Sequence, residues 1–147
     1  MFRSAATMFS LFFALVTVTT IFSHAQSAPK VDKGSLNGAN YTIIIPDGWK
    51  GKLVMYAHGY EFVGSPRQSQ NPQFVESMRL FTDRGFAVAA SDYAIQGFAI
   101  PQGVDDTEAL RKHFIKTYGK PDTTFMTGHS MGGGITLAMI ENHGGNY

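Results

Sequence analysis

A serine set between two glycines, where an apolar strand pattern gives way to an apolar helix pattern, constrains this chain most. Residues 128–132 are Gly-His-Ser-Met-Gly. Residues 123–127 before them form a short strand pattern, and residues 131–141 after them favour a helix. The spacing therefore predicts a sharp strand-to-helix turn with the hydroxyl of Ser130 pushed out of the backbone.

Such a turn has a steric and a chemical consequence. A side chain at Gly128 or Gly132 would crowd the bend, and glycine tolerates the dihedral angles that a bend requires. The helix that follows directs free N–H groups and the positive end of its dipole towards Ser130, where an oxyanion would be stabilised. We therefore predict a nucleophilic serine. A purely structural turn is the alternative, because glycine and serine are common turn residues, whereas no phosphate-binding glycine pattern surrounds the site.

Strand and helix patterns alternate along most of the chain. The expected strands are 41–45, 52–57, 86–90 and 123–127, and the expected helices are 71–85, 104–118 and 131–141. We expect Asn71 to cap the first helix with Pro72 at its first position, and Asp105 or Asp106 to cap the second. The alternation predicts a parallel sheet with helices on both faces.

In such a sheet, function lies at the carboxyl ends of the strands. Residues 58–60 (His-Gly-Tyr), residues 91–93 (Ser-Asp-Tyr) and Ser130 each follow a predicted strand. We therefore expect these three segments to meet at one edge of the sheet. The apolar, aromatic loop 93–100 points to a substrate with an apolar acyl or aryl group.

The amino-terminal residues 1–25 are typical of an export signal. Arg3 supplies the positive charge, residues 9–22 form a short apolar run, and residues 23–25 end in a small-x-small pattern before Gln26. We predict cleavage there, a secreted or periplasmic protein, and no stable membrane span afterwards; the alternative is an uncleaved anchor or a helix on the lipid surface. Residues 26–40 are polar, and we expect a linker that leads into an edge strand.

Charge and cysteine content exclude several classes of function. After removal of the signal, 11 basic and 11 acidic side chains remain without a basic patch, so we expect no nucleic-acid partner. The absence of cysteine excludes disulfides and thiol catalysis. Asp105, Asp106 and Glu108 are expected as acids at a helix start rather than as metal ligands, and we predict no metal and no cofactor.

The order of these motifs resembles the α/β-hydrolase superfamily. The strand ending in His58-Gly59, the strand ending in Asp92-Tyr93 and the Gly-His-Ser-Met-Gly-Gly turn carry the resemblance, which covers about residues 41–146. The most similar members are secreted bacterial esterase- or peptidase-like serine hydrolases. The resemblance implies an α/β-hydrolase fold, a mostly parallel sheet with helices on both faces, of which 41–147 would be the N-terminal part, truncated after the helix that follows the serine.

The resemblance also assigns roles at matching positions. Ser130 would be the nucleophile, and the backbone N–H of Met131 would be one oxyanion donor. The N–H of Tyr60 would be the second donor, with Gly59 as the alternative. His58 would shape the oxyanion loop rather than act as the base.

The resemblance leaves the catalytic acid and histidine unassigned. In the family they follow the serine along the chain, and we expect the remaining histidines (His113, His129, His143) and Asp92 to be structural. We therefore predict a serine hydrolase for small ester or peptide-like substrates, esterase more than peptidase, that is inactive as this fragment. The alternative is a non-catalytic hydrolase-like binding domain or a decayed gene product.

Overall fold

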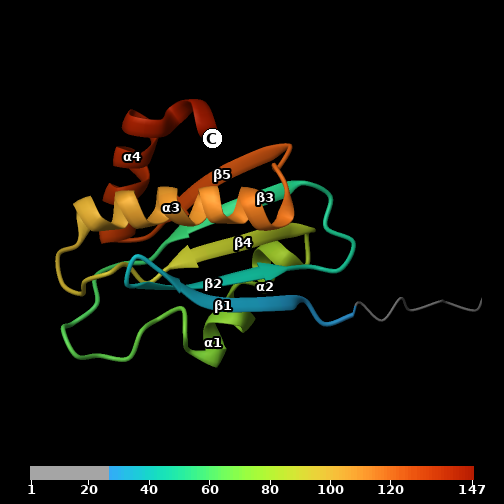
Figure 1. Ribbon diagram of the computed structural model, residues 1–147. Helices are drawn as coiled ribbons and strands as arrows, with labels where there is room; N and C mark the ends of the chain where they lie inside the picture. Colours follow the sequence, from blue (N-terminus) through green and yellow to red (C-terminus); the bar gives the residue numbers. More distant parts are fainter. Residues whose placement is uncertain (1–26) are drawn as a thin grey trace, which may run out of the picture.

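The computed structural model describes residues 27–147, and the predicted export signal lies outside the described residues. The chain forms one mixed sheet with helices on both faces (Figure 1). In chain order the elements are β1 (Lys30–Leu36), β2 (Ala39–Ile45), β3 (Lys52–Ala57), α1 (Pro72–Ser77), α2 (Arg79–Thr82), β4 (Phe86–Ser91), α3 (Ile100–Tyr118), β5 (Thr123–Gly128), α4 (Met131–His143) and a final 3-10 turn, η1 (Gly144–Asn146). None of the helices in residues 27–147 has the length and apolar character needed to cross a membrane.

The strand order is β1-β2-β4-β3-β5. Strand β3 pairs in parallel with both β4 and β5, whereas β2 is antiparallel to β1 and to β4. Four of the five strands therefore run in one direction, which confirms the predicted mostly parallel sheet. Residues 30–36, within the stretch for which we expected a linker and an edge strand, form β1 at one edge. The hairpin between β1 and β2 turns at Asn37 and Gly38, both at positive φ (52° and 87°), the combination that a two-residue hairpin turn needs.

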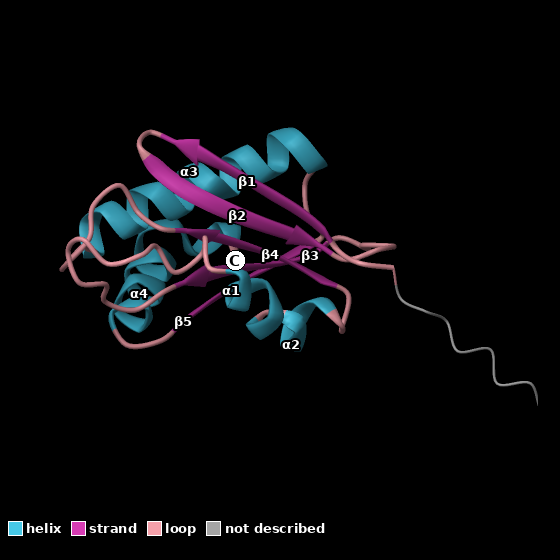
Figure 2. Cartoon of the chain, turned by 90° about the horizontal axis from the view of Figure 1, so that it is seen from below, coloured by secondary structure: helices cyan, strands magenta, loops and turns pink. Residues whose placement is uncertain are grey.

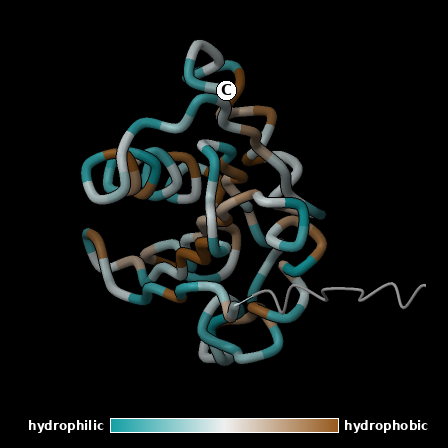
Figure 3. Tube along the Cα trace, turned by 90° about the vertical axis from the view of Figure 1, so that its right-hand side faces the viewer, coloured by the Kyte–Doolittle hydropathy of each residue, from teal (hydrophilic) through white to brown (hydrophobic). Residues whose placement is uncertain are grey.

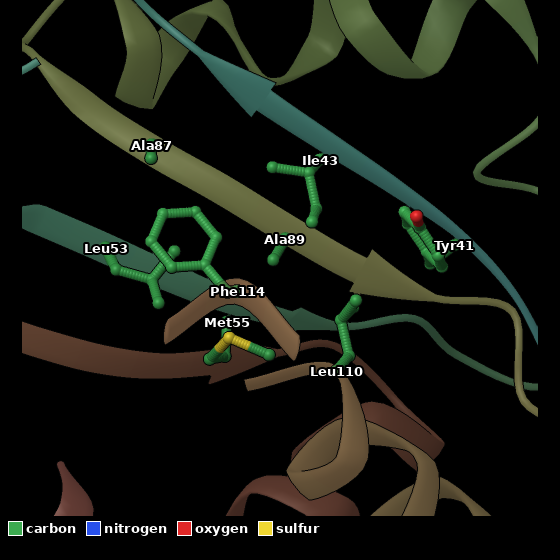
Figure 4. Close-up of a cluster of buried hydrophobic side chains, with 8 residues drawn as sticks. All are labelled: Tyr41, Ile43, Leu53, Met55, Ala87, Ala89, Leu110 and Phe114. Carbon is green, nitrogen blue, oxygen red and sulfur yellow. The ribbon is translucent and has the colours of Figure 1, made fainter. Parts of the chain in front are cut away.

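Helix α3 covers one face of the sheet. The apolar side chains of this face come from alternate positions of β2, β3 and β4 because strand side chains alternate between faces. Figure 4 shows them closing around two α3 residues, Leu110 and Phe114. Helix α4 packs beside α3 on the same side, through contacts of Ile135 and Met139 with Val104. Hydrophobic segments accordingly lie towards the middle of the chain trace (brown in Figure 3).

Helices α1 and α2 cover the opposite face (Figure 2). Phe74 and Met78 pack there against Ile44, Val54 and Val88, which point away from α3. Helices on both faces were predicted, and the sheet sandwiched between them is the expected architecture.

Two helix predictions need correction. The single helix expected over 71–85 is divided into α1 and α2 at Met78, whose ψ of −4° departs from helical values. The predicted cap is present, since the Asn71 side chain accepts a hydrogen bond from the Gln73 N–H. Helix α3 begins at Ile100 rather than Val104, with a proline in its first turn. Asp106 is therefore not a cap, and it accepts a hydrogen bond from the Ala94 N–H at 2.8 Å instead.

Strand β5 forms the other edge of the sheet within the described residues. Phe125 on β5 and two residues of α4, Leu137 and Ile140, are exposed. An edge strand and exposed apolar side chains therefore lie together at this end of the sheet.

Candidate active site

Ser130 occupies a strained backbone position between β5 and α4. Its φ of 53° and ψ of −124° lie outside the regions that residues with a side chain ordinarily adopt. The turn is held by backbone hydrogen bonds from Gly132 N–H to His129 carbonyl (2.8 Å) and from Gly133 N–H to Ser130 carbonyl (2.9 Å). Backbone strain of this kind gathers at functional sites. The Ser130 side chain is exposed, so a ligand can reach it.

The two glycines that flank Ser130 permit a close approach to the end of β3. A Cβ atom at Gly132 would collide with the Ala57 carbonyl and would lie 2.7 Å from the His58 carbonyl oxygen. A Cβ atom at Gly128 would collide with the Gly132 carbonyl and would lie 2.8 Å from the Ala57 carbonyl oxygen. Neither glycine has a positive φ. We expected both crowding and unusual dihedral angles, and the structure supports only the crowding.

The loop after β3 lies directly against the Ser130 turn. A Cβ atom at Gly59 would be 3.3 Å from the Ser130 Cβ and 2.9 Å from the His129 Nε2. In the described part of the chain, loop and turn hydrogen bonds leave the N–H groups of Tyr60 and Met131 without an acceptor. Free backbone donors close to a serine are what an oxyanion site requires.

His58 is buried under this loop. Its Nδ1 donates to the Gly59 carbonyl at 2.7 Å, and its ring stacks on that of Tyr93 with centroids 4.1 Å apart. The Tyr93 hydroxyl donates to the His58 carbonyl at 3.2 Å, and burial raises the pKa of Tyr93 far above its usual range, so this donor stays protonated. These contacts fit the loop-shaping role predicted for His58 rather than that of a base.

His58 also belongs to a buried cluster that the sequence did not reveal. Its ring, the Glu61 carboxylate and the Asp92 carboxylate offer ligand atoms within 4.8 Å of one another, the single group of this kind in residues 27–147. The two carboxylates already accept hydrogen bonds from the protein, as the Glu61 oxygen does from Gln68 N–H at 2.7 Å. The two carboxylates therefore have hydrogen-bond partners of their own within the protein, whereas the buried His58 Nε2 has none among the residues that the structure describes.

Arg67 supplies the positive charge of this cluster. Its guanidinium lies 3.5 Å from the Glu61 carboxylate and donates to the Asp92 carbonyl at 2.9 Å. The Asp92 carboxylate in turn accepts from Ser69 N–H at 2.8 Å and from the Gln70 amide at 3.2 Å. Asp92 thus fixes the loop that leads into α1, the structural role expected for it. Glu61 directly follows the His58-Gly59-Tyr60 segment, and Arg67 lies further along the same polar loop, so no pattern of its own marked either residue in the sequence.

Two other histidines, His113 and His129, form hydrogen bonds with groups other than Ser130. The exposed His129 ring is hydrogen-bonded through Nδ1 to the Tyr56 hydroxyl at 2.9 Å, and the His113 Nε2 lies 3.3 Å from the Tyr41 hydroxyl. None of the histidine hydrogen bonds in residues 27–147 involves the Ser130 hydroxyl. The structure therefore brings the turn, the Gly59–Tyr60 loop and His58 together, and it pairs no described histidine with the serine.

Solved structures share this fold, although no family model and no curated protein matches the sequence. A carboxyl esterase from Bacillus coagulans is 21% identical, with a TM-score of 0.60 over 82% of this chain and 42% of its own. A hormone-sensitive lipase from a metagenome library is 24% identical, with a TM-score of 0.60 over 81% of this chain and 39% of its own. A dienelactone hydrolase from Anabaena variabilis is 20% identical, with a TM-score of 0.62 over 82% of this chain and 61% of its own.

These likenesses define the fold. Residues 27–147 have the α/β-hydrolase fold, as the motif order implied, in the part that contains the serine turn. The chain spans about two fifths of the length of the esterase and the lipase and about three fifths of the dienelactone hydrolase.

Proposed function

We propose that the protein is a serine hydrolase of ester bonds, with Ser130 as its nucleophile. The observation that carries the proposal is the strained backbone of Ser130, held between β5 and α4, next to residues Met131 and Tyr60 whose N–H groups have no acceptor among the loop and turn hydrogen bonds of the described residues. Energy stored in a backbone at an exposed serine is difficult to explain by packing alone. The esterases and lipases among the structures with this fold support an ester substrate. An amide substrate would need the same nucleophile and the same oxyanion donors.

In the proposed reaction, the Ser130 oxygen attacks the carbonyl carbon of the ester. The electron pair of the carbonyl moves to its oxygen, which accepts hydrogen bonds from the N–H groups of Met131 and Tyr60. The amino terminus of α4 adds its dipole to this stabilisation. The Gly59–Tyr60 loop is held in position by His58, so that its donor faces the turn. The proton of the serine passes to a base, which serine needs to become an effective nucleophile.

The second candidate is a hydrolase-like domain that binds ligands without turnover. One observation favours it: no histidine hydrogen bond in the described residues reaches the Ser130 hydroxyl. In this case, the exposed surface around Ser130 would still bind an ester or another carbonyl compound, but the bond would stay intact.

The test uses the protein expressed from its whole reading frame, as wild type and as Ser130→Ala. We expect the wild type to hydrolyse a short 4-nitrophenyl ester and to be labelled by a fluorophosphonate, and the variant to lose at least about 1000-fold in kcat and all labelling. Ser77→Ala, in α1 on the opposite face, is the matched control and should leave both readouts unchanged. Equal activity in Ser130→Ala and wild type would refute the nucleophile. Ester binding without hydrolysis or labelling would favour the second candidate.

A further inference from the structure

The loop after β3, which lies against the Ser130 turn, and the loop before α3 present large apolar side chains to solvent. Tyr60, Phe62 and Val63 follow β3, and Phe98 precedes α3; their exposed fractions are 49%, 76%, 82% and 75%. We call these four residues the aromatic rim. Apolar residues that are exposed singly are ordinary, but a group of them beside a site usually marks a binding surface.

The backbone of both loops is fixed. Residues Glu61 and Gly97 form an antiparallel bridge in which the Gly97 N–H donates to the Glu61 carbonyl at 2.9 Å. Gln96 ties the two loops again, since its side chain accepts from the Gly64 N–H and donates to the Ser65 carbonyl, both at 2.8 Å. The rim is therefore held open by hydrogen bonds rather than exposed through disorder, and a ligand would not have to order it first.

The bridge also groups the rim side chains. Because the bridge is antiparallel, Tyr60, which precedes Glu61, lies opposite Phe98, which follows Gly97. The Tyr60 and Phe62 rings lie edge to face with centroids 5.3 Å apart, and the Val63 methyl group would be 3.8 Å from a Cβ at Gly97. Edge-to-face and stacked geometries are those in which aromatic rings bind one another favourably.

The rim begins where the reacting carbonyl would lie. Gly59 touches the Ser130 turn, and Tyr60, the next residue, carries both the unpaired N–H and the first ring of the rim. A carbonyl oxygen at that N–H would leave one substituent of the ester over the rim. The charged groups of the groove beneath, Glu61 and Arg67, pair with each other and offer no net charge to a ligand.

We infer that the aromatic rim binds a flat, uncharged aromatic group of the ester, so that the substrates are aryl or aryl-acyl esters. This inference rests on the proposed function and names its substrate class. A second copy of the chain is a less suitable partner. Each of the four side chains can bury less than about 200 Å², and their sum is below the roughly 800 Å² per partner that stable protein interfaces bury.

Binding can be measured apart from turnover in the full chain carrying Ser130→Ala. We would titrate methyl cinnamate and methyl butanoate by saturation-transfer NMR, with folding of each variant checked by circular dichroism. We expect methyl cinnamate to bind at least about 10-fold more tightly than methyl butanoate. Phe62→Ala combined with Phe98→Ala should weaken methyl cinnamate about 10-fold and change methyl butanoate less than 2-fold, because stacking partners of the aromatic ring are lost. Val31→Ala combined with Leu80→Ala, also exposed but distant, is the control.

Several results would overturn the inference. Methyl cinnamate affinities that are equal in the rim variant and the control, or no preference over methyl butanoate, exclude an aromatic subsite. A wild-type dimer in sedimentation that the rim variant abolishes would make the rim a contact between copies instead. Since these measurements need no nucleophile, loss of the proposed hydrolysis would leave them unchanged. Conversely, Ser130-dependent hydrolysis without an aryl preference would refute aromatic binding by the rim but would leave the proposed hydrolase function standing.

Discussion

Replacement of Gly132 by alanine tests how the serine turn is positioned. A Cβ atom there would collide with the Ala57 carbonyl, and it would meet the His58 carbonyl oxygen at 2.7 Å. Both contacts are with backbone at the end of β3, which is paired on each side with another strand. No side-chain rotation can relieve them, so α4 and the Ser130 turn must shift away from β3.

The magnitude follows from the cost of overpacking. Extra carbon atoms in a filled interior destabilise by about 1–3 kcal/mol, and a clash with fixed backbone belongs at the upper end. For a domain of about 120 residues, the entropy of unfolding near the midpoint is about 250 cal/mol/K, so 1 kcal/mol corresponds to about 4 °C. We expect Gly132→Ala to lower Tm by about 12 °C and, because the turn moves, to reduce fluorophosphonate labelling of Ser130.

Gly134→Ala, in the same helix, is the matched control. Its Cβ would have Ile100 Cδ1 at 3.5 Å as its nearest neighbour, an ordinary contact. Alanine is better than glycine inside a helix by about 1 kcal/mol, so Tm should rise slightly. Thermal unfolding followed by circular dichroism compares the two. The Cβ of Gly59→Ala would meet side chains rather than backbone, so its Tm should lie between those of the other two variants. This variant still tests the close approach if Gly132→Ala does not fold. Equal stability of Gly132→Ala and Gly134→Ala would refute the close approach.

Two further predictions concern stability. Glu108 is buried and binds Arg111 through two hydrogen bonds of 2.8 Å. Burial raises its pKa, but the hydrogen bonds and charge of Arg111 outweigh this and hold the pKa below the ordinary 4.5. A pKa lower in the folded state means that the pair stabilises fully above about pH 4.5 and that this stability is lost as the pH falls further. Glu108→Gln should therefore cost about 3 kcal/mol at pH 7 and progressively less below pH 4 in urea unfolding; a constant difference down to pH 3 would contradict this. Asn71→Ala should cost about 1 kcal/mol by loss of the α1 cap, measured in the same way, whereas Asn71→Asp should retain stability.

The main elements of the fold were readable from the sequence because their signals are local. Alternating or continuous apolar runs located β2 to β5, and Asn71 with Pro72 located the start of α1. The start of α3 was misplaced because Asp105 and Asp106 are good capping residues, while the actual start uses a proline. Nothing local distinguishes an acid that caps a helix from one such as Asp106 that bonds a neighbouring loop.

For the residues around Ser130, too, some features follow from the local sequence and others only from the tertiary structure. The glycine-serine pattern alone determined that a tight turn joins β5 to α4, because the bend depends on consecutive residues. Only the tertiary structure decided why Gly132 must be glycine, since Ala57 lies 75 positions away along the chain and approaches it through strand pairing. It also decided that His58, Glu61 and Asp92 form one buried cluster, which the partly buried Arg67 joins. Sequence specifies local geometry and burial through propensity and periodicity, whereas contacts between distant segments exist only once the sheet has been assembled.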